Sequence, residues 1–144
     1  MAPDEPSAVT VNRVDIEGRS QSPKRMTIDT GGAEFVVGDD ASPLDYLLAA
    51  FAGCINATGH KVADEMGIVI DDLAVSVGGE YDPAVFMGEA SDERAGFQAF
   101  EIEVAVDTEA DPELLHSWLE AVEERCPVSD NLQQETPATL TLDD

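Results

Sequence analysis

The sequence predicts an α+β domain in which two helices pack against a mostly antiparallel sheet. Short segments that alternate apolar and polar residues, as half-buried strands do, flank two segments with helical periodicity. Their order is strands, a long helix, strands, a second helix and a final strand. We therefore expect residues 1–144 to form a single domain, with residues 1–7 flexible.

The long helix is predicted over residues 42–66. Ser42 is a good N-cap, and Asp45 completes a capping box three residues later. Gly67 is a natural C-cap after the last helical turn. An apolar stripe at helical spacing runs along this segment and includes Cys54, one of two cysteines in the chain.

A second helix is predicted to end near Arg125, where Cys126 precedes Pro127. A residue before proline is pushed out of helical geometry, so Cys126 should leave the helix. A short helix over residues 127–132 would place Cys126 at its N-cap. The helix dipole and the neighbouring Arg125 would both favour the thiolate of Cys126.

The remaining elements are strands, turns and one long loop. The predicted strands are residues 9–16, 26–29, 34–37, 69–73, 74–81, 97–107 and 138–142, with turns over residues 18–24 and 31–32. The loop over residues 82–96 is polar but carries Phe86 and Met87. It is either a lid or subunit contact, which would cover these two side chains, or a partly packed loop.

The charge of the chain excludes two classes of partner. It has 31 acidic residues against 7 Lys and Arg, for a formal net charge of −24. Such a charge repels phosphate backbones and anionic lipid, so we expect neither nucleic acid nor membrane as a partner. The acids are interspersed, as on the surface of proteins from a salt-loaded halophilic cytoplasm, and we expect weak stability at low salt.

The cysteines point to redox chemistry or to burial, and not to a metal site. We expect a cytoplasmic protein, because the first residues lack the apolar core of a signal peptide. Two cysteines and two histidines without zinc-like spacing predict no metal and no cofactor. His60 is turned about 120° around the helix from Cys54 and is a poor base for it. From the residues alone, an inert buried role stays open for both thiols.

Two motifs resemble those of the OsmC/Ohr family of osmotically induced and organic hydroperoxide resistance proteins. The first consists of residues 42–43 (SP), 47–50 (LLAA) and 52–54 (AGC), and the second of residues 125–129 (RCPVS) followed by Leu132. The resemblance covers residues 42–142 and, more loosely, the N-terminal strands. Because the chain carries these motifs and is also very acidic, it resembles a halophilic archaeal member of this family.

The resemblance implies an intertwined homodimer with a curved sheet, two central helices per subunit, and active sites at the subunit interface. It implies reduction of organic hydroperoxides and, less well, of hydrogen peroxide. Cys54 would attack the peroxide and become a sulfenic acid, and Cys126 would resolve it as a disulfide. An external dithiol, of lipoyl type in several relatives, would restore both thiols.

One position departs from the family pattern. Leu44 stands where active relatives carry a glutamate, and Asp45 is the candidate to replace it. In the family, an N-terminal arginine pairs with that glutamate and holds the peroxidatic thiol as thiolate. Arg25 is the first candidate for this role, with Arg19 and Arg13 behind it.

Two other functions stay open at this point. The chain could be a non-catalytic member of the family that binds a small molecule as a dimer, with its cysteines simply buried. It could also be a redox sensor, which would form the same disulfide in a slow, stoichiometric reaction with peroxide.

Overall fold

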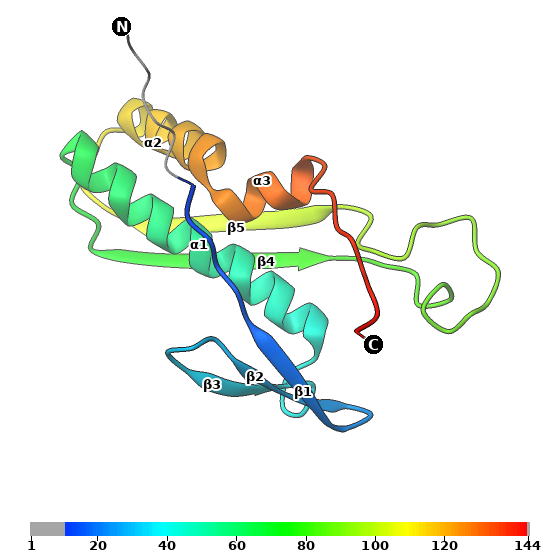
Figure 1. Cartoon of the computed structure of the whole chain (residues 1–144). Coiled ribbons are helices and arrows are strands. Elements are labelled where there is room, and N and C mark those ends of the chain that lie inside the picture. The colour runs from blue at the N-terminus through cyan, green and yellow to red at the C-terminus, as the bar shows by residue number, and fades with distance from the viewer. Residues whose placement is uncertain (1–10, 144) are drawn as a thin grey trace, which may run out of the picture. The chain divides into compact units, whose positions relative to one another are not determined.

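The computed structural model describes residues 11–143 (Figure 1). They fall into two compact units that meet in the sequence between Tyr46 and Leu47. Antiparallel strands and three helices confirm the α+β prediction. The expected flexibility of residues 1–7 lies outside the described residues, and the single domain stays a prediction. Within the described range, no helix has the length and apolar character needed to cross a membrane.

The first unit contains a three-stranded antiparallel sheet. Its strands are β1 (Glu17–Ser22), β2 (Arg25–Asp29) and β3 (Glu34–Val37), in the order β1-β2-β3. The predicted turn between β2 and β3 is confirmed: Gly31 has a φ of 90°, a conformation that glycine adopts without strain. The backbone N–H of Gly31 also donates to Asp29 Oδ1 at 2.8 Å.

The first strand does not lie where it was predicted. Residues 11–16 form no strand, residues 9 and 10 lie outside the described range, and β1 occupies most of the predicted turn over residues 18–24. All six residues of β1 are exposed. Strand pairing depends on backbone hydrogen bonds, so an exposed strand needs no apolar alternation and leaves none in the sequence.

The start of helix α1 (Pro43–Met66) has the predicted capping box. The backbone N–H and the hydroxyl of Ser42 donate to Asp45 Oδ2 at 2.9 and 3.0 Å, and the Asp45 N–H donates back to Ser42 Oγ at 3.2 Å. Tyr46 then donates its hydroxyl to the carbonyl of Val36 at 2.9 Å. The bond from Tyr46 to Val36 joins the first turn of α1 to the three-stranded sheet.

The second unit consists of the rest of α1, a hairpin and two further helices. The hairpin pairs β4 (Asp72–Gly79) with β5 (Phe100–Asp107) in antiparallel register. Helix α2 (Pro112–Arg125) runs back along α1, and the short α3 (Pro127–Gln133) follows it (Figure 1). Helix α2 ends at Arg125, as predicted, and α3 begins at the predicted residue and ends one residue later than predicted.

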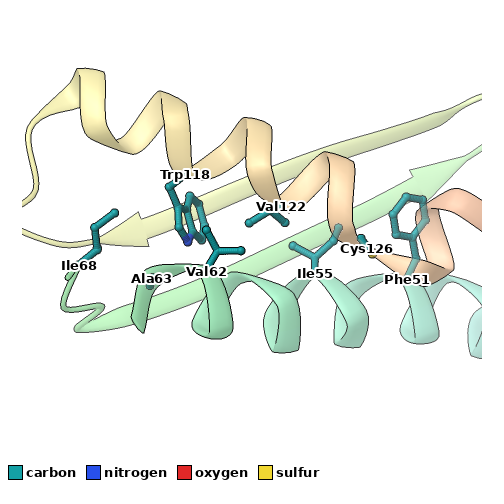
Figure 2. Close-up of a cluster of buried hydrophobic side chains, with 8 residues drawn as sticks. All are labelled: Phe51, Ile55, Val62, Ala63, Ile68, Trp118, Val122 and Cys126. Carbon is teal, nitrogen blue, oxygen red and sulfur yellow. The ribbon is translucent and has the colours of Figure 1, made fainter. Parts of the chain in front are cut away.

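The core of this unit lies between α1, α2 and one face of the hairpin. Figure 2 shows the buried cluster, which consists of Phe51, Ile55, Val62, Ala63, Ile68, Trp118, Val122 and Cys126. Trp118 is 1% exposed and donates its indole N–H to the backbone carbonyl of Gly59 at 2.8 Å. A Cβ added at Gly59 would lie 2.9 Å from Cζ2 of Trp118. Gly59 therefore lets the indole ring approach the backbone of α1.

The predictions for residues 138–142 and for the loop over residues 82–96 have different outcomes. Residues 138–142, predicted to be a strand, form none, and Leu140 and Leu142 are each 93% exposed. An alternating pattern becomes a strand only where a sheet edge pairs with it. The loop over residues 82–96 has no strand or α-helix, as predicted, and leaves Phe86 84% and Met87 64% exposed.

The contact between Gly59 and Trp118 can be tested with two alanine substitutions in α1. Gly59→Ala should lower the free energy of unfolding by about 1–2 kcal/mol, because the new methyl group overpacks against the indole ring. Gly53→Ala is the matched control, since a Cβ there meets no atom within 4 Å. It should raise stability by up to about 1 kcal/mol through helix propensity. Equal effects of the two substitutions in denaturant unfolding would contradict this packing.

Candidate functional site

The structure brings the two cysteines together. Cys54 lies on α1 and is half-buried, whereas Cys126 lies between α2 and α3 and is 1% exposed. Cys54 packs against the buried cluster that contains Cys126, and it is near enough to raise the pKa of the Cys126 thiol. Both are free thiols. Two residues 72 positions apart in the chain are therefore neighbours, as the sequence predicted.

The backbone around Cys126 is fixed by the ends of two helices. Its N–H donates to the carbonyl of Val122 at 3.1 Å, in the last turn of α2. Its carbonyl accepts from the N–H of Asp130 at 3.0 Å, in the first turn of α3. The following Pro127 forces an extended conformation, with φ −78° and ψ 110° at Cys126. The thiol is thus held at a rigid corner.

The acidity expected of Cys126 from its N-cap position is wrong. Burial raises the pKa of the Cys126 thiol, and the adjacent Cys54 raises it further. The backbone amides of Ser129 and Val128, in the first turn of α3, lower the pKa but do not outweigh burial. Cys126 consequently keeps its proton at a pH where an exposed cysteine begins to lose it.

The cation expected beside Cys126 is engaged elsewhere. Arg125 donates two hydrogen bonds to Glu65, from Nη1 to Oε1 at 2.6 Å and from Nη2 to Oε2 at 3.0 Å. These bonds lower the pKa of Glu65 and raise that of Arg125. The pair joins the last turn of α2 to the last turn of α1. The prediction that Arg125 favours a thiolate at Cys126 is therefore wrong.

Thr58, a residue outside the predicted site, lies against Cys54. The hydroxyl oxygen of Thr58 is 3.9 Å from the sulfur of Cys54, and either group could be the donor. Four residues is about one helical turn, so the spacing itself was a signal that the two side chains share a face. His60 is exposed, in agreement with its predicted exclusion as a base.

A cavity of about 190 Å³ opens beside Cys126. Its walls are mostly apolar and come from α1, β5 and α2, including Phe51 and Leu119. Ser129 and Gln133 line it from α3 and hydrogen-bond to each other at 2.6 Å. The volume and lining suit a small apolar molecule with one polar group.

The predicted arginines all belong to the first unit. Arg25 forms an ion pair with Asp39 at 3.0 Å, in which both side chains are nearly half exposed. Arg13 pairs with Asp15 at 2.8 Å, and Arg19 lies on the exposed strand β1. That one of these arginines activates Cys54 stays a prediction.

Asp45, the candidate acid, caps the N-terminus of helix α1. Both hydrogen bonds that Asp45 Oδ2 accepts come from Ser42, as the N-terminal cap of α1. Leu44 precedes it at the position of the family glutamate. The catalytic role of Asp45 also stays a prediction. Among residues 11–143, no group of three or more His, Cys, Asp or Glu side chains is placed to hold a metal ion.

Comparisons with known proteins identify a family and a fold. A family model described as OsmC-like protein matches residues 37–141. Among solved structures, an OsmC-like protein from Mycoplasma pneumoniae superposes with a TM-score of 0.77 at 20% identity, covering 88% of this chain and 91% of that one. No curated protein matches the chain.

Two other solved structures are of proteins named for hydroperoxide resistance. One is an OsmC-like hydroperoxide resistance protein from Jannaschia, with a TM-score of 0.58 and 18% identity over 88% of this chain and 89% of that one. The other is the organic hydroperoxide resistance protein OhrB of Bacillus subtilis, with a TM-score of 0.54 and 22% identity over 86% and 93%. At these identities, the likeness shows the fold.

The raised pKa of Cys126 predicts an order of reaction for the two thiols. At neutral pH, iodoacetamide should alkylate Cys54 before Cys126, because alkylation needs an accessible thiolate and Cys126 is buried and protonated. Mass spectrometry of peptides from a time course would give both rates. Raising the pH should accelerate alkylation of Cys126 beyond the pH at which an exposed cysteine levels off. Faster alkylation of Cys126 at neutral pH would contradict this order.

Proposed function

Because the chain belongs to the OsmC-like protein family, we propose that it is a thiol-dependent peroxidase that reduces organic hydroperoxides and, less efficiently, hydrogen peroxide. The observation that carries this proposal is that Cys54 packs against the buried, largely apolar cluster that contains Cys126. Two neighbouring thiols, one half-buried and one fully buried, suit a peroxidatic and a resolving cysteine. Two structural neighbours are named as hydroperoxide resistance proteins, which supports the same chemistry.

The first step forms a sulfenic acid on Cys54. The thiolate of Cys54 attacks the terminal oxygen of the hydroperoxide, an S–O bond forms, and the O–O bond breaks. The alkoxide that leaves takes a proton and departs as an alcohol. The greater exposure of Cys54 and the raised pKa of Cys126 support this assignment of roles.

The second step forms the disulfide and the third removes it. The sulfur of Cys126 attacks the sulfur of the Cys54 sulfenic acid, and its proton leaves with the hydroxyl group as water. An external dithiol then exchanges with the disulfide, becomes oxidised itself, and returns both cysteines to thiols. The apolar cavity beside Cys126 offers a place for a small apolar dithiol such as a lipoyl group.

Arg25 and Asp45 are proposed to assist the first step. Both would have to change partners, because Arg25 pairs with Asp39 and Asp45 caps α1. An ion pair this exposed is worth at most about 1 kcal/mol, so Arg25 can exchange it at small cost. A cation beside a thiolate favours the charged form of the sulfur.

A homodimer is part of this proposal. Ile102 and Leu119 are exposed to about 40% on the second unit and line apolar cavities beside β5 and α2. A second copy of the chain would cover such apolar surface. A partner subunit would also cover the exposed side chains of Phe86 and Met87, in the loop over residues 82–96.

A slow redox-sensing dimer is the alternative that one observation favours. Leu44 replaces the family glutamate, and the neighbouring Asp45 is already used as a helix cap. Without an acid to orient the arginine, the thiolate would be less activated and the reaction with peroxide slower. The same disulfide would then report on peroxide instead of removing it.

The peroxidase proposal predicts distinct results for the two cysteines. Cys54→Ser should abolish consumption of tert-butyl or cumene hydroperoxide, measured in high salt with a dithiol present, because the nucleophile is lost. Cys126→Ser is the matched control. In a sample without dithiol, it should still consume one equivalent of peroxide and leave a sulfenic acid that dimedone traps, since only resolution is lost.

Turnover by the Cys54→Ser protein at the wild-type rate would refute the peroxidase. Wild-type protein that reacts slowly with one equivalent of peroxide and forms its disulfide, with no sustained consumption of peroxide when dithiol is present, would favour the sensor.

The dimer proposal predicts a mass close to twice 15.3 kDa in high salt. Sedimentation equilibrium is the suitable measurement, because the charge of −24 distorts elution from a gel-filtration column. Leu119→Glu should shift the equilibrium toward the monomer, since it places a charge on the apolar surface between β5 and α2. A monomeric wild-type protein at concentrations near 100 μM, chosen as roughly a hundred times a micromolar Kd, would contradict this proposal.

A further inference from the structure

We propose that Thr58 is a catalytic residue of this site, whose hydroxyl donates a hydrogen bond to the reacting sulfur of Cys54. The inference deepens the proposed peroxidase function and rests on it for the word catalytic. The contact itself is independent of that function. It assigns the Cys54 thiolate a hydrogen-bond donor that lies on the same helix.

The geometry that supports this assignment is local and rigid. Cys54 and Thr58 lie one turn apart on α1, and both are half-buried. The Thr58 oxygen is 3.9 Å from the Cys54 sulfur while the sulfur is a neutral thiol. An α-helix fixes the two Cα atoms, so a rotation of the threonine side chain is enough to shorten the contact.

Deprotonation of Cys54 decides the direction of this hydrogen bond. As a thiol, Cys54 can donate to Thr58 or accept from it. As a thiolate it has no proton and can only accept, so the Thr58 hydroxyl must be the donor. Hydrogen bonds to a charged acceptor are shorter and roughly twice as strong as neutral ones, so this contact strengthens when the nucleophile forms.

A half-buried thiolate needs such a donor. Cys54 packs against an apolar cluster, where water is partly excluded and an unpaired charge is costly. The thiol of Cys126 lies in the same cluster and keeps its proton, because burial raises its pKa. It therefore adds no negative charge near Cys54, and Thr58 is positioned as a hydrogen-bond donor to the sulfur from the same helix.

The test removes the hydroxyl without changing the shape of the side chain. Thr58→Val is nearly isosteric and deletes only the donor, whereas Thr58→Ser keeps the donor and deletes a methyl group. Both are made in full-length Cys126→Ala protein, so that Cys54 is the only thiol. The rate of alkylation of Cys54 by iodoacetamide is then measured across a pH series, together with the rate of sulfenic acid formation by tert-butyl hydroperoxide.

We expect Thr58→Val to slow alkylation about threefold to tenfold at neutral pH, as the loss of one hydrogen bond to a charged group implies. The rise of the alkylation rate with pH should move to higher pH, while the rate at the high-pH plateau stays unchanged. Thr58→Ser should stay within about twofold of the parent. A residue that merely packed against Cys54 would show the reverse order. Serine loses the methyl group of threonine, whereas valine keeps it and fills the place of the hydroxyl with a second methyl group.

Alkylation of the Thr58→Val protein with the parent's rate and pH dependence would overturn the inference. Thr58→Ala is a second variant without the hydroxyl, and it decides the question in the same assay if the valine variant does not fold. Alkylation requires no peroxide, so the inference and the proposed function fail separately. A wild-type protein that consumes no peroxide would refute only the function.

Discussion

The packing of α2 along α1 holds the candidate site together. The close approach of Trp118 to Gly59 sets the spacing between these two helices. Glycine at that position admits the indole ring, and the indole N–H is satisfied by the Gly59 carbonyl at 2.8 Å. The same helix pairing carries Cys126 to Cys54 about two turns further along α2, and the bidentate Arg125–Glu65 pair adds a second link between the helices. Because the interior is close-packed, a change in this spacing would be transmitted to the sulfur atoms.

Burial, and not the local helix dipole, sets the protonation of Cys126. Its position at the start of α3 gives it nearby amides that lower the pKa, yet desolvation outweighs them. This leaves one thiol that keeps its proton near a more exposed thiol. In the proposed mechanism, that proton leaves with the hydroxyl group of the sulfenic acid as water when the sulfur of Cys126 attacks.

The acidic surface has a structural cost in the hairpin. Asp72 on β4 pairs directly with Asp107 on β5, and both are exposed. Like charges at opposed positions in antiparallel strands destabilise the sheet, and salt reduces this repulsion. The apolar face of the same hairpin packs against the helices, through pairs such as Val75 with Val104. The expected dependence of stability on salt therefore has a definite location in the fold.

The sequence by itself determined the α+β class, the bounds of α1, the end of α2 and the capping box at Ser42, and it singled out the two cysteines. These features depend on local signals, such as caps, prolines and helical periodicity, or on motifs around the two cysteines. Only the tertiary structure decided which residues surround each sulfur. It turned Arg125 toward Glu65, placed Thr58 against Cys54, moved β1 to an exposed segment and left residues 138–142 without a strand. The reason is physical: ion pairs, strand edges and desolvation depend on segments distant in the chain, whose positions no local pattern records.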